Sequence, residues 1–170
     1  WLLFLYFSNP LCLIYSKGLL EKYKNNNQSL YRFYKHNDFY NLCNTLHKIY
    51  IIENNNSLED KIGKELQLRD KSIKQDSKNP NPCLNVIEII IDIFKDVEGI
   101  PINTKSACKR LCMMLRWLVR NDNIVDLGIW TILQPQDLII PLDTHVHKQA
   151  LLLNLTKSKQ ANMQTALEIT

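Results

Sequence analysis

Apolar residues recur three and four positions apart along most of the chain, which is the spacing of one face of a helix. No segment alternates apolar and polar residues as a half-buried strand does, and glycine is rare. We therefore predict an all-α protein in which 1–170 form a single helical domain that is incomplete at both ends. Helices are expected over 1–7, 11–23, 38–50, 57–66, 84–97 and 105–120 and after Asp143.

Polar residues mark the starts of two of these helices. Asp38 precedes the apolar stripe of 38–50 and is predicted to be its N-cap, because a carboxylate there accepts backbone N–H groups. Ser57, followed three residues later by Asp60, predicts the start of the next helix in the same way. The polar segment 71–82 contains two Asn-Pro steps and is predicted to be an exposed linker that could divide the fold into two lobes.

The isoleucine-rich segment 84–97 has the composition of a strand but the periodicity of a helix. Isoleucine favours strands by propensity. At about 100° per residue, however, the apolar side chains gather on one arc and the charged ones lie opposite. We predict a helix that is ended by Gly99 and Pro101. The apolar arc consists of Val86, Ile87, Ile90, Ile91, Ile93, Phe94 and Val97.

The segment 105–120 predicts an amphipathic helix with a narrow cationic stripe, whose members fall within roughly 60° of one another. The stripe consists of Lys105, Lys109, Arg116 and Arg120. No acidic residue within the segment offers these cations an i, i+4 partner, and phosphates would relieve their mutual repulsion. The stripe is therefore either an ordinary solvated face or a nucleic-acid-binding surface. The formal net charge of +4 permits a polyanionic partner without requiring one.

Asp143 follows the extended apolar run 138–142 and precedes a helical pattern through Val146, Ala150 and Leu153. It is therefore predicted to cap that helix by accepting backbone N–H groups. The helix dipole and these donors favour the ionised carboxylate. Such a carboxylate can stabilise a cation or accept a proton from an ammonium group.

The cysteines and histidines do not predict a metal centre. The five cysteines lack the spacing of a disulfide framework, which favours reduced thiols in an intracellular, cytoplasmic protein. Cys108 and Cys112 share the apolar face of 105–120 and are predicted to be buried structural thiols. His145 and His147 would point about 200° apart on one helix, so they would not chelate one ion together. We expect no metal and no cofactor.

Four short motifs resemble those of a known family. They read Ser-Ala-Cys-Lys-Arg-Leu at 106–111, Leu-Arg-Trp-Leu-Val-Arg at 115–120, Val-Asp-Leu-Gly-Ile-Trp at 125–130 and Ile-Pro-Leu-Asp-Thr-His-Val at 140–146. The set resembles the DUF2400 family of bacterial proteins of unknown function. The segment 142–148 also resembles the Val-Asp-Thr-His-aliphatic-x-Arg motif of helix-hairpin-helix (HhH-GPD) DNA glycosylases. The fold that this resemblance implies is that of the HhH-GPD glycosylases.

The glycosylase resemblance implies a reacting pair. Lys109 matches the catalytic lysine and Asp143 the motif aspartate, so Lys109 would attack C1′ of an extruded nucleoside and form a Schiff base. The chain departs from the glycosylase pattern in three places. It has no glycine at 103–107, where the phosphate-binding hairpin would lie, an apparent insertion at 121–136, and Lys148 at the motif's arginine position.

We predict a DNA-binding protein of the glycosylase-like superfamily that excises bases by lysine Schiff-base chemistry and does not associate with a membrane. Two alternatives stay open: a noncatalytic helical module that binds DNA or RNA, and a protein-interaction domain with an acidic partner. Trp117 and Trp130 are interpreted first as core residues and His145 as a structural residue. Each is also a secondary candidate for a base pocket, since aromatic side chains stack on flipped bases. The candidate phosphate contacts are Lys105, Arg110, Arg116, Arg120 and Lys148.

Overall fold

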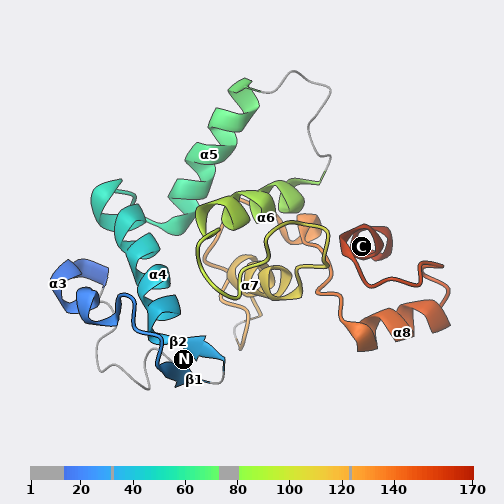
Figure 1. Ribbon diagram of the computed structural model, residues 1–170. Helices are drawn as coiled ribbons and strands as arrows, with labels where there is room; N and C mark the ends of the chain where they lie inside the picture. Colours follow the sequence, from blue (N-terminus) through green and yellow to red (C-terminus); the bar gives the residue numbers. More distant parts are fainter. Residues whose placement is uncertain (1–13, 32, 73–80, 123) are drawn as a thin grey trace. The chain divides into compact units, whose positions relative to one another are not determined.

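The computed structural model describes residues 14–31, 33–72, 81–122 and 124–170, and this part of the chain is mainly helical (Figure 1). It forms two compact units. The first extends to Lys61 and includes Ile93–Ile100, and the second comprises Ile62–Asp92 and Pro101–Thr170. The helix expected over 1–7 and most of the linker expected over 71–82 lie outside the described residues. Both flanks of that linker belong to the second unit, so the division between the units falls elsewhere.

The first unit packs a short helix and a small hairpin around one longer helix (Figure 1). Leu20 of the short helix contacts Phe39, Tyr40 and Cys43 of the longer one in a common core. The hairpin is antiparallel and pairs Ser29 with Lys35; it was not predicted, because strands this short show no alternation. The elements are α3 (Lys17–Leu20), η1 (Glu21–Tyr23), β1 (Ser29–Tyr31), β2 (Tyr34–Lys35), α4 (His36–His47) and η2 (Lys48–Ile52).

The N-cap prediction for α4 was wrong by three residues. Lys35 is the N-cap, and Asp38 lies at the third helical position. The Asp38 side chain reaches back to accept the backbone N–H of Lys35 at 2.7 Å. An acidic residue satisfies an N-terminal donor equally well from this position, so the sequence pattern alone does not distinguish the two.

The remaining helices lie in the second unit, except for the start of the first of them, before Ile62, and Ile93 at the end of the next. Ser57 caps the first of them as predicted, because its Oγ accepts the backbone N–H of Asp60 at 3.0 Å. The isoleucine-rich segment is a helix as predicted, with Ile87 and Ile90 in the core, although it ends at Ile93. The elements are α5 (Leu58–Ser72), α6 (Pro82–Ile93), α7 (Lys109–Val119), η4 (Pro135–Asp137), α8 (Thr144–Leu152) and α9 (Met163–Ile169).

Helix α7 lies near α6, since Cys112 of α7 and Cys83 of α6 are neighbours, and both helices contribute buried residues to the second unit (Figure 1). Leu111, Cys112, Leu115 and Val119 are the buried residues of α7. These buried residues lie on one face of α7, so the opposite face is available for polar side chains. Among the described residues, no helix combines the length and the apolar character that crossing a membrane requires.

Candidate nucleic-acid interface and reacting pair

Helix α7 begins at Lys109, later than predicted, because Cys108 has a left-handed backbone with φ 46° and ψ 35°. This conformation costs a residue with a side chain roughly 1–2 kcal/mol. The Cys108 thiol compensates in part by donating to the carbonyl oxygen of Ser106 at 3.3 Å. Lys105 consequently lies in the turn before the helix, so the prediction of one helical stripe from Lys105 to Arg120 was wrong at its first member.

The lysine and the aspartate of the predicted pair are in contact. Lys109 Nζ donates to Asp143 Oδ2 at 2.7 Å. Asp143 is the N-cap of α8, and its Oδ1 accepts the backbone N–H groups of His145 at 2.9 Å and Val146 at 2.8 Å. Asp143 therefore caps α8 as predicted and uses its second oxygen for the lysine. The Lys109 side chain is 48% exposed and that of Asp143 28% exposed, so solvent reaches the pair.

Two helix N-termini meet at this ion pair. Lys109 is the first residue of α7, and Asp143 precedes the first residue of α8. Both ends carry the positive pole of a helix dipole, which favours anions. The first turn of α7 has no acidic residue but begins with Lys109 and Arg110, two cations at the pole that disfavours them. Asp143 offsets this charge only in part, so the location suits an anionic ligand.

The environment of Asp143 keeps its carboxyl group ionised. The hydrogen bond from Lys109, followed by the backbone N–H of Val146, lowers the pKa of Asp143 to about 2. A carboxylate with so low a pKa is a weak base. Asp143 is therefore better suited to stabilise a positive charge than to accept a proton.

A second group of charges lies at the other end of α7. Arg116 is in its last turn and Arg120 is its C-cap residue. Their Nε atoms lie 3.3 and 3.5 Å from the same Oδ2 of Asp126. The Asp126 side chain is fully buried, whereas those of Arg116 and Arg120 are 39% and 47% exposed. The arginines therefore have an acidic partner, which the sequence of α7 alone does not contain.

Residues 124–130 fold back on α7 and place Asp126. The Asp122 side chain accepts the backbone N–H groups of Ile124, Val125 and Asp126 at 2.8–2.9 Å and thereby closes a tight turn. These bonds lower the pKa of Asp122 to about 2.

Backbone bonds then fix this segment to the helix. The backbone N–H of Leu127 donates to the carbonyl of Trp117 at 2.6 Å, and that of Trp130 to the carbonyl of Leu118 at 2.8 Å. Gly128 allows the close approach, since a Cβ there would lie 2.5 Å from the Cβ of Asn121.

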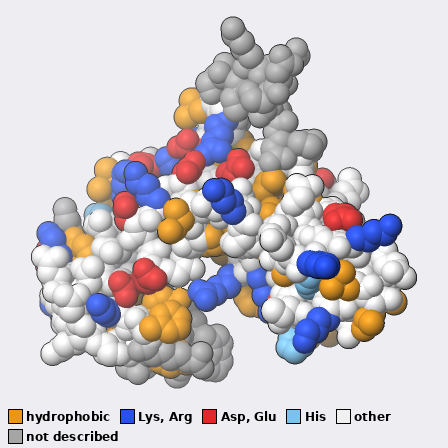
Figure 2. Space-filling model, turned by 45° about the vertical axis from the view of Figure 1, so that its right-hand side comes forward, with side chains coloured by type: hydrophobic (Ala, Val, Ile, Leu, Met, Phe, Trp, Pro, Cys, Tyr) orange, Lys and Arg blue, Asp and Glu red, His pale blue; other side chains and the backbone are white. Residues whose placement is uncertain are grey.

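Lys109 and Arg116 of α7 and its C-cap residue Arg120 share one side of the helix. Positions 109, 116 and 120 lie within about 40° of one another on an α-helix, and Arg116 and Arg120 lie roughly 10 and 16 Å along the axis from Lys109. Lys105, Arg110 and Lys148, the other predicted phosphate contacts, are exposed. Figure 2 shows the visible Lys and Arg side chains in separate groups instead of one continuous basic patch. The candidate interface is thus defined by particular side chains more than by bulk charge.

Of the candidates for a base pocket, His145 lies beside the pair, because its backbone N–H donates to Asp143. Trp117 is 42% exposed, so the prediction that it is a core residue was wrong, and Trp130 is half-buried. His145 is exposed on α8, whereas His147 is buried with its Nε2 2.8 Å from the carbonyl oxygen of Ser158. The part of the chain that the structure describes contains no group of three or more His, Cys, Asp or Glu side chains able to bind a metal.

The described cysteines are free thiols in the cores of the two units: Cys43, Cys83, Cys108 and Cys112. Burial raises the pKa of Cys112 to about 12 and that of Cys83 to about 11. Thiols with such pKa values are poor nucleophiles at neutral pH. This agrees with the structural role predicted for Cys108 and Cys112.

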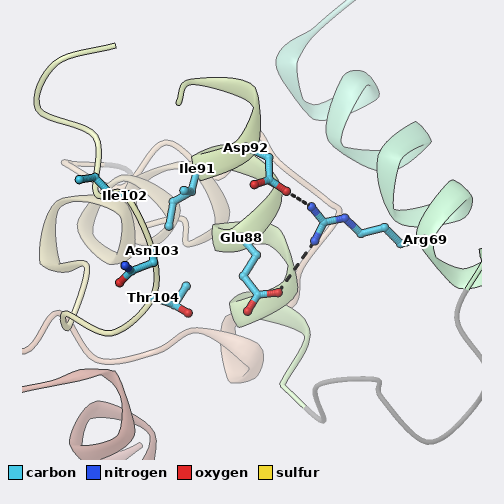
Figure 3. Close-up of a pocket in the computed structure, with 7 residues that line it drawn as sticks. All are labelled: Arg69, Glu88, Ile91, Asp92, Ile102, Asn103 and Thr104. Atoms are coloured by element: carbon cyan, nitrogen blue, oxygen red, sulfur yellow. Dashed lines mark hydrogen bonds and ion pairs between the residues drawn. The ribbon is translucent and has the colours of Figure 1, made fainter. Parts of the chain in front are cut away.

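A pocket of about 280 Å³ lies beside the turn that precedes α7. Figure 3 shows Arg69 reaching from α5 to Asp92 and Glu88 on α6 at one wall, with Asn103 and Thr104 at the other. Two carboxylates in this wall make the pocket unsuitable for phosphate. The pocket therefore does not share the suitability for anions of the cationic side of α7.

The chain matches the sequence profile of one family, described as "Protein of unknown function (DUF2400)", over residues 3–170. The chain belongs to the DUF2400 family. No curated protein and no solved structure matches it. The resemblance drawn from the four motifs is thereby confirmed for DUF2400, and the motifs at 115–120 and 125–130 are the ones that supply Arg116, Arg120 and Asp126.

Sequence reasoning missed two residues that shape this interface. Asp126 lies in the motif at 125–130, where an aspartate between valine and leucine is a signal for a buried carboxylate with a cationic partner. Cys108 was assigned to the helix face, and its left-handed backbone has no signal in the sequence, since glycine and asparagine are the usual residues there.

Proposed function

We propose that this DUF2400 protein is a DNA-binding enzyme of the glycosylase-like superfamily, with an HhH-GPD-like fold, in which Lys109 and Asp143 are the reacting pair for base excision. The contact of 2.7 Å between Lys109 Nζ and Asp143 Oδ2 supports this proposal most directly. Residues 34 positions apart come together at the N-termini of two helices, where an anionic backbone would bind. DNA is the expected partner and the cytoplasm the expected location.

The reaction begins when the Lys109 amine has lost its proton. The Nζ lone pair forms a bond to C1′ while the bond from C1′ to the base breaks, and its electron pair leaves with the base, which solvent protonates. The new C1′ ammonium then loses a proton, the sugar ring opens as its oxygen gains one, and a Schiff base remains. Asp143 acts electrostatically, by stabilising the positive charge that develops at the sugar.

Borohydride trapping tests the covalent step. The protein is incubated with a labelled DNA duplex that carries an abasic site, sodium borohydride is added, and the covalent adduct is separated by denaturing electrophoresis. We expect an adduct with the unaltered chain and none with Lys109→Gln. Lys157→Gln removes an exposed lysine outside the interface and should leave the adduct unchanged. An adduct that persists in Lys109→Gln would exclude Lys109 as the nucleophile.

The ion pair itself favours a second candidate, a noncatalytic nucleic-acid-binding module. Lys109 Nζ donates to a carboxylate oxygen at 2.7 Å, and a side chain that binds a carboxylate in this way can bind phosphate through the same kind of charge-assisted hydrogen bond. In this case Lys109 contacts phosphate together with Arg116 and Arg120. Salt-dependent binding to duplex DNA without any borohydride adduct would support this candidate over the enzyme.

A further inference from the structure

We infer that Asp126 is a positioning residue that orients Arg116 and Arg120 to bind backbone phosphate of a nucleic acid as one unit. The inference rests on the proposed nucleic-acid partner, but it concerns the end of α7 opposite to the reacting pair. It assigns a role in binding polyanions to a buried negative charge. A count of charges predicts the opposite, namely that a negative residue weakens the binding of a polyanion.

Asp126 cannot be an ordinary surface charge, because its side chain has no exposure. Burying an ionised carboxylate is costly unless it is paired. Its Oδ2 is paired with the two arginines, whereas its Oδ1 is buried without a hydrogen-bond partner among the described residues. A fold that keeps an incompletely satisfied carboxylate here gains little stability from it. The arrangement is therefore better explained by what it does to the arginines.

The contact geometry leaves the arginines able to bind a second acceptor. Both ion pairs use Nε, and a guanidinium group has four further N–H donors on its terminal nitrogens. The arginine side chains are 39% and 47% exposed, so solvent and a dissolved anion reach part of each one. Planar guanidinium groups bind phosphate oxygens with two parallel hydrogen bonds when their orientation is fixed.

Without Asp126 the same arginines would separate. They are four residues apart at the C-terminal end of α7, so their like charges repel each other. A shared carboxylate beneath them removes that repulsion and restricts their side-chain rotamers before the ligand arrives. A phosphate that approaches from solvent meets the guanidinium groups, because the carboxylate lies buried behind them.

Salt-dependent binding of the full chain to a fluorescein-labelled DNA duplex tests the inference. We expect Asp126→Asn to weaken binding by about tenfold and to reduce the slope of log K against log salt by about 1, although the variant is less negative. Asp92→Asn is the matched control, since it removes the same charge from the exposed ion pair with Arg69 in the pocket of Figure 3. It should leave affinity and slope unchanged. Tighter binding by Asp126→Asn would overturn the inference.

A double-mutant cycle separates positioning from loss of folding. In Arg116→Ala/Arg120→Ala, the additional change Asp126→Asn should alter affinity less than twofold, because there is nothing left to orient; a further tenfold loss would overturn the inference. If Asp126→Asn does not fold, Arg116→Lys/Arg120→Lys keeps the charge and replaces the guanidinium groups, and unchanged affinity in it would overturn the inference. The same experiment distinguishes failure of the proposed function from failure of this inference. If the unaltered chain shows no salt-dependent DNA binding, the proposed function fails. If it binds and Asp126→Asn binds equally well, only the role of Asp126 fails.

Discussion

The two ends of α7 carry the same kind of interaction in opposite surroundings. At the N-terminal end, Lys109 meets Asp143 at a helix pole that disfavours cations, and both side chains are partly exposed. At the C-terminal end, Arg116 and Arg120 lie at the pole that favours cations, and their partner Asp126 is fully buried. Solvent and ligands can reach both side chains of the first ion pair, whereas in the second group they reach the arginines but not the buried Asp126. The proposed function assigns chemistry to the first end and phosphate binding to the second.

The substitution Leu115→Ala tests how much the buried face of α7, which lies between its two ends, contributes to stability. Leu115 is fully buried between them on α7, so Leu115→Ala should lower the free energy of unfolding by about 2–5 kcal/mol. Urea denaturation followed by circular dichroism measures this loss. Leu152→Ala is the matched control, because Leu152 is 74% exposed and should change stability by no more than about 0.5 kcal/mol. Equal losses in the two variants would show that Leu115 does not pack in a core.

The sequence predicts the shared core of α7 but not the difference between its ends. Helical periodicity identifies Leu115 as buried, and the run before Asp143 identifies that residue as a helix cap. Periodicity cannot show that the helix begins only after Cys108, because the spacing of apolar residues carries no information about a left-handed backbone at one residue. It also cannot show that Asp126 pairs with Arg116, because that contact depends on how a loop folds back.

The substitution Gly128→Ala tests whether the two ends of α7 are independent of each other. The φ of Gly128 is +60°, and an added Cβ would lie 2.5 Å from that of Asn121, so Gly128→Ala should cost at least about 1–2 kcal/mol and displace Asp126. The N-terminal pair should remain, as judged by an unchanged NMR pKa of Asp143. Gly18→Ala is the matched control, since nothing lies within 4 Å of a Cβ there, and we expect no loss of stability. A shifted pKa of Asp143 in Gly128→Ala would show that the ends are coupled.

The smallest expected effect distinguishes the carboxylates beside the two ends by their pKa values. Asp143 and Asp122 both have a pKa of about 2, but Asp143 owes it first to the Lys109 side chain and Asp122 to backbone N–H groups. Lys109→Gln should therefore raise the pKa of Asp143 to between about 2 and the ordinary 3.8, because the backbone donors remain, and leave that of Asp122 unchanged.

A carboxylate whose pKa is lowered by folding stabilises the protein above pH 3.8, and this contribution is lost as the pH falls toward 2. Lys109→Gln should accordingly lose less stability than the unaltered chain over that interval. Carbon-detected NMR titration of the carboxyl groups measures both pKa values, and Lys157→Gln controls for the change in net charge. An unchanged pKa of Asp143 in Lys109→Gln would mean that the ion pair does not form in solution, and the contrast between the two ends of α7 would then rest on Asp126 alone.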